Sequence, residues 1–322
     1  MTTELAAMYR RWADVETVGS SPIYEGWARG IADDPELLAR IAVLPPIKRQ
    51  PNLLFGAARW LGAEAGSFAD FRAWALPRWP QLVEVMLARA TQTNEAARCA
   101  VLLPALAAID GPIALIEVGA SAGLCLYPDR YSYRFTTSDG VVALDPPDGP
   151  SPVVIPCAMD APAVPARLPT IVWRAGLDLS PNDVRDAGTL RWLDALIWPE
   201  HEERRARLHA AAALVALDPP EIVAGDLVDD LAALVDRAPA GARVVVMHSA
   251  VLMYPPPERR AQFVELVTSL PGVTWIANEG EHVLPSIADR VTEPVEGRFI
   301  VSVDGAPIGL AGPHGQSYTA LR

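Results

Sequence analysis

One short stretch, residues 113–126, constrains the fold of this chain more than any other. It begins with an apolar run at 113–118 that has strand length and is apolar on both faces, as in a central parallel strand. Only Glu117 interrupts that run. The residues from Gly119 to Gly123 are all small, so the backbone of a turn there can approach a ligand closely. The pattern predicts a buried strand that leads into a ligand-binding turn.

Two chemistries share this pattern. An acid near the end of a first strand, followed by a turn with glycines, is typical of a nucleotide-type site in a doubly wound sheet. Here these residues are Glu117, Gly119 and Gly123, with Ala120 and Ser121 between the glycines. The same residues spell Gly-x-Ser-x-Gly, the nucleophile elbow of α/β-hydrolases, with Ser121 as nucleophile and as cap of the next helix. A third interpretation is a tight strand-to-helix connection without a ligand.

Composition limits the partners of the chain. Its 322 residues, 51% of them hydrophobic, have room for one large domain or two modest ones. Lys and Arg total 27 against 39 Asp and Glu, a net charge of −12 that disfavours nucleic acid as a partner. Three cysteines without metal-ligand spacing indicate a reducing compartment and no metal site. The chain lacks a signal-peptide pattern and an apolar run of about 18 residues, so we expect a cytoplasmic protein without a membrane partner. The oligomeric state is not indicated.

The first 110 residues show helical patterning only, which predicts an all-helical N-terminal domain or lid. Leu5, Met8 and Trp12, for example, repeat at spacings of three and four. Asp34 and Pro35 are typical of a helix start. The polar segment that contains Tyr24 stands out from this apolar pattern, and we include Tyr24 among the candidate substrate-binding residues.

A second polar segment, residues 92–98, lies in an otherwise apolar stretch. One interpretation is a helix start with Thr93 or Asn94 as the cap. The other places Asn94, Glu95 and Arg98 on one helical face, since their spacings are three and four. Such a set suits a zwitterionic ligand.

Residues 111–322 alternate strands and helices, with an acid or histidine at or just after the end of each central strand. In an open parallel sheet, ligands bind at this edge. The polar residues are Glu117, Asp178, Asp226, His248 and Glu279. Strands are expected at 113–118, 171–173, 221–224, 243–247 and 273–277, helices at 184–197, 200–217, 227–235 and 257–270, and hairpins at 131–144 and 298–310.

This order, closed by an antiparallel hairpin, resembles the class I S-adenosylmethionine-dependent methyltransferase fold, a doubly wound Rossmann-like α/β sheet. The resemblance implies that S-adenosylmethionine is the cofactor and that the loop from Glu117 to Gly123 binds it. It further implies that Asp178 holds the ribose and that Asp226 lies near the adenine. Ser121 stands where the family has the middle glycine of Gly-x-Gly-x-Gly.

For such a methyltransferase we expect a small polar molecule as the methyl acceptor. His248 follows the most buried strand and is the candidate general base. Tyr254 and the prolines after it loosely resemble the Asn/Asp-Pro-Pro-Tyr loop of amino-group methyltransferases, although the residues before Tyr254 differ from that loop. The candidate substrate-binding residues are Tyr24, Asn94, Glu95, Arg98 and Glu279.

Taken from end to end, the chain is also similar to a bacterial family catalogued as domain of unknown function number twenty-three thirty-two. The residues that carry this resemblance are 21–24, 93–95, 117–124, 129–131, 176–181, 192–193 and 198–199. The resemblance implies a methyltransferase-like fold and supplies no particular reaction.

Two alternatives remain open. A serine hydrolase needs an acid and then a histidine after Ser121, an order that Asp226 or Glu279 followed by His282 or His314 satisfies. No His-Gly-Gly-Gly loop precedes the serine, and helical patterning occupies the place of the first strands. The other alternative is a non-catalytic binding protein on a methyltransferase-like fold.

Overall fold

The computed structural model describes residues 2–92 and 94–321, and the chain divides into two compact units. The helical unit comprises Met1–Thr93 and Arg185–Ala206, and the α/β unit comprises Asn94–Val184 and Arg207–Arg322. The boundary expected from the sequence was residue 110, and 185–206 were expected in the α/β region. The division differs because Trp192 and Ala195 are buried in the apolar core of the helical unit.

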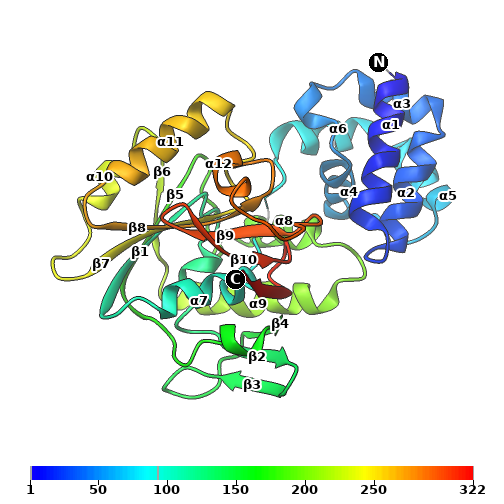
Figure 1. The fold of residues 1–322 in the computed structure, drawn as a ribbon. Coiled ribbons are helices and arrows are strands. Elements are labelled where there is room, and N and C mark those ends of the chain that lie inside the picture. The colour runs from blue at the N-terminus through cyan, green and yellow to red at the C-terminus, as the bar shows by residue number, and fades with distance from the viewer. Residues whose placement is uncertain (1, 93, 322) are drawn as a thin grey trace. The chain divides into compact units, whose positions relative to one another are not determined.

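The α/β unit is built on one mixed sheet, whose strands in the described residues run in the order β3-β2-β4-β11-β10-β9-β8-β7-β1-β5-β6 (Figure 1). The strands are β1 (Pro112–Val118), β2 (Ser132–Thr137), β3 (Gly140–Leu144), β4 (Val154–Met159), β5 (Thr170–Asp178), β6 (Glu221–Ala224), β7 (Arg243–Ser249), β8 (Val273–Gly280), β9 (Phe299–Val303), β10 (Ala306–Ala311) and β11 (Ser317–Ala320).

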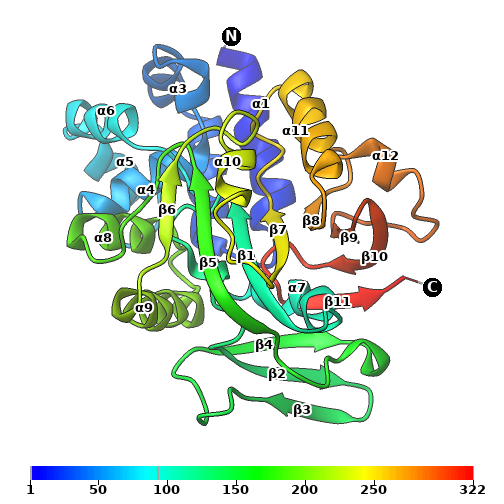
Figure 2. The same cartoon turned by 90° about the vertical axis from the view of Figure 1, so that its left-hand side faces the viewer.

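Five neighbouring strands, β6-β5-β1-β7-β8, are parallel, and Figure 2 shows β6, β5, β1 and β7 side by side. After β1 the chain first forms β2, β3 and β4 at the far end of the sheet. It then adds β5 and β6 on one side of β1 and returns to the other side of β1 with β7. The carboxyl ends of β1 and β7 are therefore the point where the strand order reverses.

One face of this sheet carries an apolar core with three helices, α10 (Leu231–Val235), α11 (Pro257–Ser269) and α12 (Pro285–Ala288). Ile116, Val118 and Trp275 are among its strand residues. Since side chains alternate along a strand, Glu117 and Asn278 point to the opposite face. Helix α7 (Arg98–Ala107) contacts β4, β8 and β9.

The central strands and both hairpins expected from the sequence are confirmed. Two strands were missed, β4 and β11, which pair with each other over Ser317–Ala158 and Tyr318–Met159. β11 also pairs with β10, and β4 with β2, but the pairing of β4 with β11 joins segments that lie far apart in sequence. Tertiary pairing and not local propensity therefore decides where they lie in the sheet. The helix expected after the glycine turn is only a 3₁₀ turn, Leu124–Leu126.

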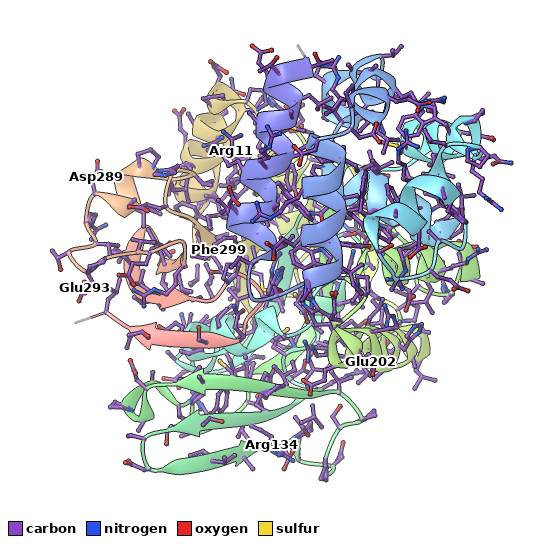
Figure 3. The ribbon with its side chains drawn as sticks, turned by 90° about the vertical axis from the view of Figure 1, so that its right-hand side faces the viewer. Arg11, Arg134, Glu202, Asp289, Glu293 and Phe299 are labelled. Atoms are coloured by element: carbon purple, nitrogen blue, oxygen red, sulfur yellow. The ribbon has the colours of Figure 1, made fainter. Side chains whose placement is uncertain are left out.

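In the helical unit, the described residues up to 92 form helices and no strand. The α-helices are α1 (Thr2–Trp12), α2 (Pro22–Ala32), α3 (Pro35–Ala42), α4 (Pro51–Trp60), α5 (Phe68–Ala75) and α6 (Trp79–Ala88), joined by α8 (Ala187–Leu196) and the start of α9 (Glu202–Leu217). Trp27, Phe55 and Phe71 meet in the core, where Trp27 stacks on Phe71 at 4.3 Å. Charged residues such as Arg11 on α1, labelled in Figure 3, are exposed.

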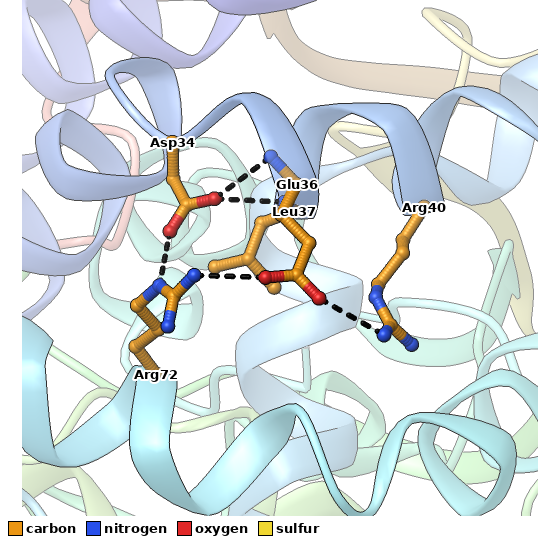
Figure 4. Close-up of polar contacts among 5 residues, drawn as sticks. All are labelled: Asp34, Glu36, Leu37, Arg40 and Arg72. Atoms are coloured by element: carbon orange, nitrogen blue, oxygen red, sulfur yellow. Dashed lines mark hydrogen bonds and ion pairs between the residues drawn. The ribbon is translucent and has the colours of Figure 1, made fainter.

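The start of α3 confirms the helix start expected at Asp34 (Figure 4). One carboxylate oxygen of Asp34 accepts the backbone N–H groups of Glu36 and Leu37, both at 2.9 Å, and the other pairs with Arg72. Glu36 pairs with Arg72 at 2.9 Å and with Arg40 at 3.1 Å. Partial burial opposes ionisation of Asp34, but these donors hold its pKa below the ordinary value.

No helix in the described residues is long and apolar enough to cross a membrane.

Candidate functional site

The turn after β1 adopts the left-handed conformation at three positions, with φ of 70° at Gly119, 48° at Ser121 and 71° at Gly123. A serine in this region costs about 1–2 kcal/mol, whereas glycine does not. A Cβ at position 119 would lie 2.4 Å from a methyl group of Val251, and one at position 123 would lie 2.9 Å from Pro220. Both glycines are therefore required by backbone conformation and by close packing.

Two asparagine side chains hold Ser121 in this conformation. Asn94 Nδ2 donates to Ser121 Oγ at 2.9 Å, and Asn94 Oδ1 accepts the Ala122 N–H at 2.9 Å. Asn182 Nδ2 also donates to Ser121 Oγ, at 2.8 Å, and its backbone N–H donates to the Ser121 carbonyl. Asn182 was missed from the sequence, because it lies in a loop 61 residues away and carries no motif.

Asp178, the last residue of β5, also binds this turn. Its Oδ2 accepts the Ser121 N–H at 2.8 Å, and its Oδ1 accepts the Ser180 N–H at 2.7 Å. Each oxygen retains a second lone pair for a ligand hydroxyl. Because β1 and β5 are adjacent, with Glu117 paired to Gly176, the structure places Asp178 beside the glycine turn. The ribose-binding role expected for Asp178 stays a prediction.

Glu117 is 7% exposed, and its Oε2 has no hydrogen-bond partner among the described residues. Burial raises the pKa of Glu117 well above its ordinary value, and the Cys125 thiol adds to the effect. The positive charge of the Arg98 guanidinium acts in the opposite direction and lowers the pKa of Glu117. Burial at this position therefore favours the protonated form of the Glu117 carboxyl group.

A second unsatisfied acceptor, Asn278 Oδ1, lies on the same face of the sheet two strands away. Asn278 is fully buried, and its Nδ2 donates to Ser249 Oγ at 2.8 Å, while Oδ1 has no partner in the described part of the chain. Arg98 Nη1 donates to the Ser249 carbonyl at 2.9 Å, and its Nε donates to the Pro313 carbonyl at 3.1 Å. Asn278 was not among the expected site residues, although its place at the end of a buried strand was a signal.

His248 and Glu279 form a buried pair on the other face, toward α11. His248 Nδ1 lies 2.7 Å from Glu279 Oε1, and His248 Nε2 accepts the Trp275 indole N–H at 2.9 Å. These partners assign the Nδ1–H tautomer. Glu279 Oε1 also accepts the N–H groups of Val251 and Leu252. Neither ring nitrogen of His248 therefore keeps a free lone pair that could accept a proton from a substrate. This arrangement does not favour His248 as a general base, and that role stays a prediction.

The two other residues expected from the sheet edge, Asp226 and Tyr254, lie in loops after β6 and β7. Partial burial opposes ionisation of Asp226, but the Val228 N–H and Arg259 hold its pKa below the ordinary value. Arg259 belongs to α11, and its guanidinium pairs with Asp226. Tyr254 is 64% exposed. Their roles toward cofactor and substrate stay predictions.

The polar segment before α7 does not form one helical face. Helix α7 begins at Arg98, so Asn94 and Glu95 lie before it. Glu95 Oε1 accepts the Ala97 N–H at 3.1 Å and the Arg207 Nε–H at 2.9 Å in a buried ion pair. Asn94 instead binds the glycine turn. Thr93, the alternative cap, lies outside the described residues. Tyr24, expected as a substrate residue, is 1% exposed in the core of the helical unit.

Ser121 lacks the surroundings of a nucleophile. An attacking hydroxyl needs a base that accepts its proton. Both hydrogen bonds to Ser121 Oγ come from amide donors, and within residues 2–92 and 94–321 no histidine bonds to it. The hydrolase interpretation stays a prediction that this geometry does not favour.

Fold and site together define a mixed α/β protein with unsatisfied polar groups at the carboxyl edge of its parallel strands. The model of one family, described as an uncharacterized protein conserved in bacteria (DUF2332), matches residues 6–319. The chain therefore belongs to this family. No curated protein and no solved structure matched the chain.

Proposed function

We propose that this protein binds S-adenosylmethionine and transfers its methyl group to a small polar molecule. The observation that carries the proposal is the buried, unpartnered Oε2 of Glu117 at the carboxyl end of β1. The order β6-β5-β1-β7-β8 resembles the first five strands of a doubly wound sheet, written 3-2-1-4-5. In such sheets ligands bind beside the first strand, where the strand order reverses.

The groups at this edge fit the cofactor because they are acceptors, whereas the cofactor carries a cationic amino group, a sulfonium and ribose hydroxyls. Glu117 Oε2 and Asn278 Oδ1 lack donors, and both Asp178 oxygens keep a lone pair. When bound, S-adenosylmethionine supplies an electrophilic methyl group. Glu117 and Asn278 would hold the cationic end, and Asp178 the ribose.

The remaining contribution of the chain is positioning. Asn94, Asn182 and Asp178 fix the glycine turn by hydrogen bonds before any ligand arrives. A prearranged site avoids the entropy cost of ordering the loop during binding and aligns the reacting groups. No base is needed for an acceptor that is already a nucleophile in its neutral form.

Calorimetric titration with S-adenosylmethionine, and separately with S-adenosylhomocysteine, tests the proposal. The wild-type protein should bind both ligands with micromolar affinity. Glu117→Gln removes the charge and keeps the shape, and it should weaken binding at least about tenfold, which corresponds to about 1.4 kcal/mol. Glu265→Gln, an exposed position on α11, is the matched control and should bind as the wild type does. Failure of the wild type to bind either ligand would exclude the proposal.

A further inference from the structure

Four buried hydrogen-bond donors in the helical unit have no acceptor among the described residues. One is the Tyr9 hydroxyl on α1, and the other three are the Tyr24 hydroxyl on α2, Arg59 Nη1 on α4 and Arg205 Nη2 on α9. Each of these atoms is shielded from solvent. A buried donor without an acceptor costs about 1–3 kcal/mol, and more when it is charged.

Tyr24, Arg59 and Arg205 belong to neighbouring segments. The Tyr24 ring packs on Phe55, which lies one turn before Arg59 on α4. Ser21 beside Tyr24 donates to Glu200 just before α9. Of the charged groups that act on the Tyr24 hydroxyl, Arg59 has the largest effect, and Arg205 and Glu200 also act on it. Burial raises the pKa of Tyr24, so its hydroxyl keeps the proton and remains a donor.

The surrounding structure fixes the positions of these donors. The Tyr24 ring packs against Phe55 with ring centroids 4.8 Å apart and against Trp198 at 5.9 Å. Arg205 Nε is held by Asp194 Oδ1 at 3.2 Å. The unsatisfied atoms are therefore set by packing and ion pairing.

The two nearby carboxylates, Asp194 and Glu200, already have partners. Asp194 pairs with Arg205, and Glu200 accepts the Ser21 hydroxyl at 2.7 Å and the Ile23 N–H at 2.9 Å. In the described part of the chain Arg59 has no carboxylate within ion-pair distance. The partly buried guanidinium of Arg59 thus lacks a counter-charge, and the Tyr24 hydroxyl and Arg205 Nη2 are two further donors without an acceptor.

We propose that Tyr24, Arg59 and Arg205 bind a small oxyanion, a carboxylate or a phosphate group, within the helical unit. Guanidinium groups match the planar oxygens of carboxylate and phosphate, and one such anion can accept all three hydrogen bonds. The site is independent of the proposed function, because its residues all belong to the helical unit.

Chemical denaturation of the full chain, with phosphate, acetate or chloride at matched ionic strength, tests this site. Inorganic phosphate or acetate should stabilise the wild type saturably, and chloride should not. Stabilisation by only one of the two oxyanions identifies which group is bound. Equal effects of all three salts, or no effect of either oxyanion, would overturn the proposal.

Tyr24→Phe separates binding from structure, since it removes the hydroxyl and keeps the ring that packs on Phe55. Without an oxyanion, this variant should be as stable as the wild type or more so, because an unsatisfied donor is gone. With saturating oxyanion it should be less stable, and its affinity should fall at least tenfold. Equal loss of stability with and without the anion would show a purely structural role.

A second variant keeps the test decisive if the tyrosine substitution changes packing. Arg59→Met should also reduce oxyanion affinity at least tenfold. Arg11→Gln, on the exposed side of α1 (Figure 3), is the matched control and should leave that affinity unchanged. If Arg11→Gln lost as much oxyanion affinity as Arg59→Met, the effect would come from general surface charge, and the proposal would be overturned.

Discussion

The side-chain amide of Asn94 lies 2.9 Å from the hydroxyl oxygen of Ser121, across 27 positions of sequence. Its carbonyl oxygen accepts the next backbone N–H, that of Ala122, at the same distance. One side chain thus makes two hydrogen bonds to the turn that follows β1. The segment before α7 is therefore part of the candidate site.

Asn94→Ala should destabilise the α/β unit by about 1–3 kcal/mol, because it leaves the Ala122 N–H without its acceptor and removes a donor from Ser121. Urea denaturation followed by circular dichroism measures the change. Asn94→Asp, which keeps the acceptor for Ala122, should fall between the wild type and the alanine variant. An unchanged midpoint in Asn94→Ala would show that this contact contributes nothing to stability.

Ser121→Gly and Ser121→Ala both remove the hydroxyl, so their difference isolates the cost of the left-handed backbone. At φ of 48° glycine is unstrained and alanine is not. We therefore expect Ser121→Gly to be more stable than Ser121→Ala by about 1 kcal/mol. The two free energies of unfolding, measured in parallel, check this order, and the reverse order would mean that the turn relaxes.

Glu117 should make stability fall with rising pH. Its folded pKa is raised, so above its unfolded pKa of about 4.3 the folded state binds more protons than the unfolded state. Its contribution is complete below that pH and is lost as pH rises through the raised folded pKa. The stability of the wild type relative to Glu117→Gln, measured over this range, should decline. A difference independent of pH would indicate an ordinary pKa.

Binding of a cationic ligand should release a proton from Glu117. Below its raised pKa the free protein holds that proton, and a positive charge beside the carboxyl group favours its ionised form. Titration with S-adenosylmethionine in buffers of different ionisation enthalpy measures the number of protons released. We expect about one proton for the wild type and none for Glu117→Gln. Equal proton release by both proteins would place the ligand away from Glu117.

The sequence predicted the elements that depend on local patterns. The apolar runs of β1 and β7 and the Asp-Pro start of α3 are confirmed, because strand burial and helix capping leave marks within a few residues. The burial of Glu117 within β1 could be expected for the same reason, since an acid within an apolar run is visible in the sequence alone.

Contacts between distant segments were not visible. Asn182 and Asn278 carry no motif, and His248 gave no sign that Trp275 and Glu279 occupy both of its ring nitrogens. Arg59 and Arg205, which act on the Tyr24 hydroxyl, lie in ordinary helical sequence.

The sequence by itself determined the central parallel strands, the glycine turn and the acid before it, because these follow from hydrophobicity and backbone sterics over a few residues. Only the tertiary structure decided which polar atoms find partners. Hydrogen bonding of a buried group depends on which segments meet there, and in this protein that choice leaves Glu117, Asn278, Tyr24 and Arg59 unsatisfied.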